Sequence, residues 1–175
     1  TVFTGDKKLV QYRKGATWSF MTVLTHEVFN RPGPRKITAS DDLLVLLVQG
    51  AFDNEGKGEV LVFERPSMDA AFTHTYTMAG TGSYLGEAAA CTNSIIVVST
   101  GNGGVATYIR DATSWIVHDN WRENQILTPT KYDSSLSLGT LATGVIRLAI
   151  GTPNMGNTSG GNGNVHVYDF LDSIW

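Results

Sequence analysis

The chain has 175 residues, of which 42% are hydrophobic and 17% charged, and its 13 basic and 16 acidic residues leave a net charge of −3. This length suits one domain, 1–175, and makes a second independent core unlikely. Both signs of charge are mixed along the chain, so the basic stripe that binds a phosphate backbone is missing, which argues against nucleic acid as a partner.

A short strand pattern that carries an aromatic residue close to its end occurs four times. The segments are 7–14 (KKLVQYRK), 58–65 (GEVLVFER), 103–111 (GGVATYIRD) and 163–170 (GNVHVYDF). Their aromatic residues, which we call the strand aromatics, are Tyr12, Phe63, Tyr108 and Tyr168. Recurrence of one pattern at loose spacing indicates an internal repeat.

Each of these segments leads through a short polar turn to a second aromatic residue. We call these residues the turn aromatics: Trp18, Phe72, Trp115 and Trp175. The alternating stretches that begin near the first three are typical of strands. We expect the two segments around each turn to pair as a hairpin, with the turn tryptophans packed in the core or between repeats.

Before three of the four segments comes an apolar run closed by a glycine-rich loop. These stretches are 43–58, 94–104 and 145–163. The run LLVLLV is about a third of the twenty residues that a membrane-spanning helix needs, so it predicts a buried strand and no membrane span. The segments 82–94 and 134–144 are rich in small residues, which suit a crowded strand.

The repeating unit therefore has four strands, and we predict an all-β fold of β-propeller-like blades, each of four antiparallel strands. Approximate repeats cover 7–57, 58–102 and 103–162, with a partial repeat at 163–175. A two-layer sandwich is the alternative, but it does not predict strands that recur in order. Three repeats suggest an incomplete ring, completed by a longer polypeptide, by other copies of the chain, or by closure as a small four-bladed form.

These patterns resemble the FG-GAP repeats of integrin α-subunit propellers. The resemblance lies in IGTP (150–153), in the strands ending at Phe63 and Tyr168, in GATW (15–18), in KITASDD (36–42), and in YLGEA (84–88), where Leu85 replaces the usual Phe. It spans nearly the whole chain in a degenerate form. It implies a propeller fold and a role in adhesion or extracellular assembly at the cell surface.

The family often carries calcium loops rich in Asp and Asn, because calcium prefers six to eight oxygen ligands. One loop here has adjacent acidic residues, with Asp53 and Glu55 on either side of Asn54. A weak calcium site at this loop is therefore a hypothesis, with a solvated loop as the alternative. No other cofactor is expected.

Two further candidate sites are polar or aromatic. Trp121 lies outside the repeat pattern, beside the hydrogen-bonding residues Asn120 and Arg122, and could stack against a sugar ring. Asn157 begins an N-x-S/T sequence, which predicts glycosylation if the protein passes through a eukaryotic secretory pathway.

Catalytic patterns are lacking in the sequence. His26, His74, His118 and His166 have no second His or Cys at metal-ligand spacing, and we expect His74 and His166 to face solvent. No serine lies in a G-x-S-x-G elbow, and the lone Cys91 is expected to be a buried apolar residue rather than a reactive thiol. The sequence predicts a non-catalytic module for protein contact, adhesion or structural assembly, with a carbohydrate-binding propeller or the scaffold of a glycan-active enzyme as the alternative.

Overall fold

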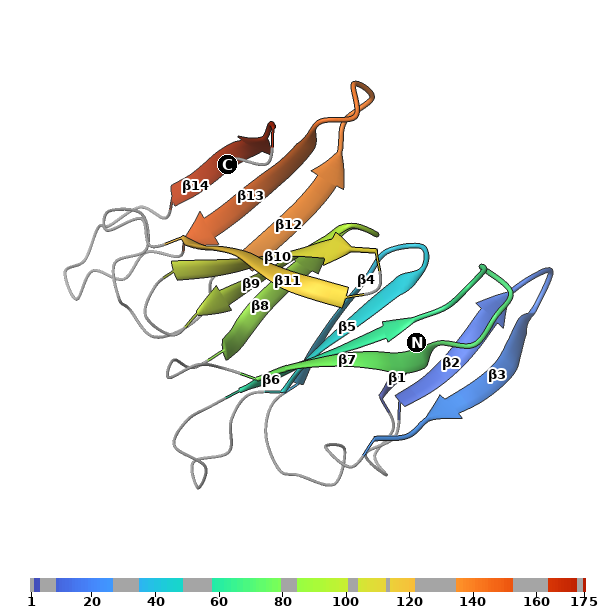
Figure 1. The fold of residues 1–175 in the computed structure, drawn as a ribbon. Helices are drawn as coiled ribbons and strands as arrows, with labels where there is room; N and C mark the ends of the chain where they lie inside the picture. Colours follow the sequence, from blue (N-terminus) through green and yellow to red (C-terminus); the bar gives the residue numbers. More distant parts are fainter. Residues whose placement is uncertain are drawn as a thin grey trace, which may run out of the picture.

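The strands predicted from the alternating and apolar segments form antiparallel sheets in chain order (Figure 1). The structure is a computed structural model and describes residues 2–3, 9–26, 35–48, 58–79, 85–100, 104–112, 114–121, 135–152, 164–172 and 175. Its strands are β1 (Val2–Phe3), β2 (Leu9–Lys14), β3 (Trp18–Leu24), β4 (Arg35–Ala39), β5 (Leu43–Val48), β6 (Glu59–Glu64), β7 (Thr73–Ala79), β8 (Leu85–Cys91), β9 (Ile95–Thr100), β10 (Gly104–Asp111), β11 (Ser114–Trp121), β12 (Ser135–Thr140), β13 (Ile146–Thr152) and β14 (Asn164–Phe170).

These strands make four sheets, and in each sheet neighbours in sequence are neighbours in space. The first sheet is β1-β2-β3, the second β4-β5-β6-β7, the third β8-β9-β10-β11 and the fourth β12-β13-β14. The prediction of an all-β fold with four-stranded antiparallel units is confirmed. Over the described ranges, no helix is long and apolar enough to cross a membrane.

The sheets divide the chain at other points than the predicted repeats do. The predicted repeats begin with the strand that carries the strand aromatic, whereas the second and third sheets each begin two strands earlier, at β4 and β8. The predicted limit at 57/58 consequently falls between β5 and β6, which pair along their whole length. The repeating unit therefore keeps four strands but is shifted in phase by two strands.

An irregularity recurs at the strand aromatic in three sheets. The register shifts between Gln11 and Tyr12, between Val62 and Phe63, and between Thr107 and Tyr108. In each case the following strand supplies one extra residue, as in a β-bulge, which increases the local twist of the strand pair. A bulge at one equivalent position in three sheets shows that the repeat extends from sequence to backbone geometry.

The sheets stack face to face, and an apolar core fills each of the three spaces between them (Figure 1). The second and third sheets are therefore covered on both faces. This arrangement explains why all six residues of the predicted LLVLLV strand, β5, are buried. An antiparallel strand with one solvent-exposed face alternates apolar and polar residues. A strand that is covered by other sheets on both faces is apolar at every position.

The small residues of β8 permit a close approach between sheets. This strand lies against β4 and β5 of the second sheet and also against β12 of the fourth. Ala88, Ala90 and Cys91 are buried in it, and the Ala88 amide donates to Ser99 Oγ at 2.8 Å. The prediction that the small-residue segment forms a crowded strand is confirmed for β8.

Cys91 lies in the core between the second and third sheets, as the sequence predicted. Burial raises the pKa of its thiol from 9.0 to about 11, an effect partly offset by contacts with Thr38 and Ser40. Because the thiolate is the reactive form, Cys91 in the native protein should react with iodoacetamide at pH 8 at least about 100-fold more slowly than in the urea-unfolded chain. Mass spectrometry of quenched samples measures both rates, and similar rates would contradict the buried placement.

Candidate functional site

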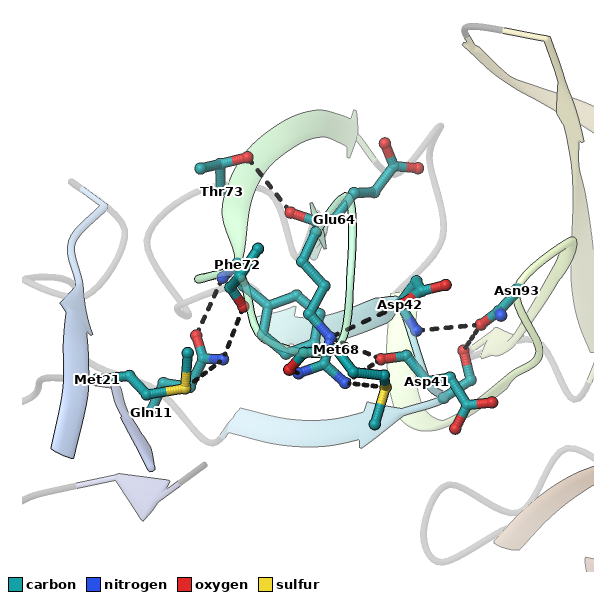
Figure 2. Close-up of polar contacts among 12 residues, drawn as sticks. Gln11, Met21, Asp41, Asp42, Glu64, Met68, Phe72, Thr73 and Asn93 are labelled. Atoms are coloured by element: carbon teal, nitrogen blue, oxygen red, sulfur yellow. Dashed lines mark hydrogen bonds and ion pairs between the residues drawn. The ribbon is translucent and has the colours of Figure 1, made fainter. Parts of the chain in front are cut away.

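Contacts between neighbouring sheets follow one plan, and the first example joins the first sheet to the second. Gln11 on β2 is 2% exposed. Its Oε1 accepts the backbone amide of the turn aromatic Phe72 at 3.0 Å, and its Nε2 donates to the Ala70 carbonyl at 3.4 Å (Figure 2). A buried amide whose donor and acceptor atoms are both used holds the two sheets in one register.

The second example joins the second sheet to the third. Glu64, which follows the strand aromatic Phe63, accepts a hydrogen bond from Trp115 Nε1 at 3.2 Å. Its Oε1 also lies 3.2 Å from Nη2 of Arg110. One carboxylate therefore binds two donors of the next sheet: a turn aromatic and the cation that lies two residues after the strand aromatic.

The third example joins the third sheet to the fourth. Trp175 Nε1 donates to Thr107 Oγ1 at 3.0 Å, and its ring packs against Phe170 with centroids 4.9 Å apart. In all three interfaces the turn aromatic, or its backbone amide, is the donor to a polar side chain of the preceding sheet. Tryptophan suits such positions because its large apolar ring can be buried while its indole N–H still finds a hydrogen-bond acceptor.

Arg65, which directly follows β6, makes a separate set of contacts at one end of the second sheet. Its guanidinium donates from Nε to the Asp41 carbonyl at 2.7 Å and from Nη1 to the Met68 carbonyl at 3.0 Å, and it lies 4.7 Å from the centroid of the Phe72 ring. The side chain is 11% exposed. Since its donors are used by backbone carbonyls of two turns, the role of Arg65 is to join those turns.

One surface of the first sheet is not covered by any other sheet among the described residues. We call it the N-terminal outer face, and it carries Tyr12, Lys14, Trp18 and Phe20. Tyr12 is 41% exposed, Phe20 61% and Trp18 67%. Tyr12 and Phe20 contact each other edge to face, with centroids 6.2 Å apart. Three neighbouring aromatic side chains thus form an exposed apolar patch.

The opposite end of the stack carries a second open surface. We call it the C-terminal outer face, and it is formed by Arg147 and Ala149 of β13 and by Val165, Val167 and Asp169 of β14. Val165 is 71% exposed and Val167 55%. Arg147 binds the Asp169 carboxylate through two hydrogen bonds of 2.6 and 2.8 Å, which lowers the pKa of that carboxyl and raises the pKa of the guanidinium.

The structure places only part of the residues predicted for sugar binding. Asn120 and Trp121 end β11, where they pair with Ala106 and Val105 of β10. Arg122 lies outside the described residues. The proposed calcium ligands Asp53, Asn54 and Glu55 and the glycosylation candidate Asn157 also lie outside them. These hypotheses therefore stay predictions from the sequence.

The histidines divide into different environments. His74 is exposed, as predicted, and its ring contacts His26 with centroids 4.5 Å apart. His166 was expected to face solvent, and this expectation is wrong, because the residue is half-buried on the side of β14 that faces the third sheet, with its Nε2 buried. Within the described ranges, no three His, Cys, Asp or Glu side chains come together as a metal site would require.

The expectation of a packed environment holds for some turn tryptophans only. Trp115 is 4% exposed and Trp175 joins the core between the third and fourth sheets, whereas Trp18 is open. The prediction is therefore wrong for Trp18, because no sheet precedes the first one in the described structure. Val165 and Val167 are not among the predicted site residues, although their equivalents in the second sheet, Val60 and Val62, are buried between sheets.

The fold and its open surfaces define an all-β protein of repeated antiparallel sheets with an exposed apolar face at each end. No protein-family model matches the chain, and no curated protein matches it in sequence.

Proposed function

We propose that the chain is a non-catalytic, propeller-like repeat module that acts by protein–protein contact through its two outer sheet faces. The sheets would be successive blades, each packed against the next by the same pair of faces. The repeated bulge and the repeated contact of the turn aromatic support this interpretation.

One observation carries the proposal. The strand aromatics Phe63 and Tyr108 are 1% and 6% exposed because each packs on the sheet before it, whereas Tyr12 is 41% exposed at the equivalent position. An exposed patch built like a buried interface indicates a surface that another protein covers. The resemblance to FG-GAP repeats adds adhesion or extracellular structural assembly to the proposal.

Carbohydrate binding is the second candidate, since exposed Trp18, Phe20 and Tyr12 could also stack on sugar rings. A glycan array compares the two functions. We expect no saturable glycan binding by the wild-type chain. Saturable binding that is lost in Trp18→Ala or Trp121→Ala would favour a lectin-like function instead.

Cross-linking mass spectrometry tests protein contact directly. The immobilised chain is incubated with a protein extract, and the cross-links are mapped onto the chain. We expect them to concentrate at 9–24 and 164–171 and to fall sharply in Tyr12→Glu, but not in Val117→Glu, a control that is 57% exposed on the edge strand β11. Cross-links that ignore both outer faces would contradict the proposed function.

A further inference from the structure

The two outer faces carry separate halves of the contact that joins the second sheet to the third. In that internal contact, Glu64 lies one residue after the strand aromatic of its sheet and accepts the indole N–H of Trp115. Arg110, two residues after the next strand aromatic, completes the contact at 3.2 Å from the same carboxylate oxygen.

On the C-terminal outer face, Asp169 occupies the position of Glu64. It lies one residue after the strand aromatic Tyr168, as Glu64 lies one residue after Phe63. The pairing registers agree, because Phe63 pairs with Leu44 and Tyr168 pairs with Leu148 in the preceding strand of each sheet. A carboxylate acceptor therefore lies at the open end of the stack where an internal interface has Glu64.

On the N-terminal outer face, Trp18 and Lys14 occupy the positions of Trp115 and Arg110. Lys14 lies two residues after the strand aromatic Tyr12 and pairs with Trp18 across the β2–β3 hairpin. Arg110 pairs with Trp115 across β10 and β11 in the same way. This face thus presents an indole N–H and a cation, which are the two donors that an internal interface directs at a carboxylate.

The apolar parts of the two faces also match. Val165 and Val167 have Val60 and Val62 as their equivalents in the second sheet, and both of those are 0% exposed against the third sheet. Ala149 beside them leaves room for large side chains. The other face supplies such side chains in Tyr12 and Trp18, whose equivalents Tyr108 and Trp115 are 6% and 4% exposed between the second and third sheets. Large residues opposite small ones fill an interface at the density of a protein interior.

The two faces lie at opposite ends of the stack, so they do not meet within one chain (Figure 1). We propose, resting on the proposed function, that a second copy of this chain covers them: the N-terminal outer face of one copy packs on the C-terminal outer face of the next. Asp169 of one copy accepts the Trp18 indole N–H of its neighbour and pairs with the Lys14 ammonium. The carboxylate has lone pairs for these donors besides the two hydrogen bonds from Arg147.

The contact joins two unlike surfaces, so it is heterologous and generates rings or filaments rather than a two-fold dimer. Sedimentation velocity over a broad range of protein concentration should show the wild-type chain growing from monomer to dimer and larger species. Tyr12→Glu blocks the N-terminal outer face and Val165→Glu blocks the C-terminal one, both at exposed positions that should not disturb folding. Each variant alone should stay monomeric.

A mixture of the two variants gives the decisive result. Each copy then keeps one intact face, so the mixture should form a dimer and nothing larger. Trp18→Phe, which keeps a ring but removes the indole N–H, should weaken wild-type association by about tenfold. The control Val117→Glu should associate as the wild type does.

A wild-type chain that stays monomeric at every concentration would overturn the inference, and so would a mixture that fails to dimerise or a Val117→Glu control that fails to associate. The proposed function is tested separately. If the chain stays monomeric but still forms cross-links to other proteins at its outer faces, only the inference of a second copy fails.

Discussion

Replacing Phe63 by Ala is expected to lower the free energy of unfolding by about 3–5 kcal/mol. The ring is 1% exposed in the core between the first and second sheets. Its removal leaves a cavity because the flanking strands β5 and β7 are held by their ladders and cannot close the gap. Urea unfolding followed by tryptophan fluorescence and circular dichroism measures the change.

Tyr12→Ala is the matched control for Phe63→Ala. Tyr12 is the equivalent strand aromatic, next to an equivalent bulge, but it is 41% exposed on the N-terminal outer face. Its removal should cost less than about 1 kcal/mol in dilute protein. If both variants lost the same free energy of unfolding, the result would contradict the placement of Phe63 on a covered sheet face and of Tyr12 on an open one.

Replacing Trp115 by Ala is expected to destabilise the chain by a similar amount, about 3–5 kcal/mol. The side chain is 4% exposed between the second and third sheets, and its indole N–H binds Glu64. Trp115→Phe keeps most of the packing but removes this hydrogen bond, so it should cost about 1–3 kcal/mol. The difference between the two variants separates packing from hydrogen bonding.

Ile116→Ala provides the control for Trp115→Ala, because Ile116 is the next residue of β11 and is 46% exposed. Its loss should remain within about 1 kcal/mol, which is the range of intrinsic strand preference. Equal losses at the two positions would show that Trp115 does not join the sheets. Trp18→Ala should resemble the control in stability while it weakens self-association.

Much of the fold follows from local patterns. The alternation in β3 and β7 and the unbroken apolar run of β5 predict strands, because side chains alternate between the faces of a sheet and only a strand covered on both sides is apolar throughout. The recurrence of Tyr12, Phe63, Tyr108 and Tyr168 predicts that the strands repeat in order. The structure has these strands in the expected sequence of neighbours.

The surroundings of individual side chains did not follow from those patterns. Trp18 and Trp115 both open a strand after a short polar turn, yet one is 67% exposed and the other 4%. His166 alternates with two valines, as a solvent-facing residue would, but here the valines are exposed and the histidine faces the third sheet. Alternation identifies two faces without saying which of them is covered.

Strand positions, the aromatic repeat and the small-residue strand β8 are local properties, set by the spacing of side chains along an extended backbone, and they could be predicted from the residues alone. The stacking of the sheets decided which sheet faces are open at the two ends of the molecule. It also decided that the carboxylate of Asp169, the ammonium of Lys14 and the indole N–H of Trp18 lie on those open faces. The physical reason is that burial on a sheet face depends on which other sheet lies opposite, and segments far apart in the chain determine that.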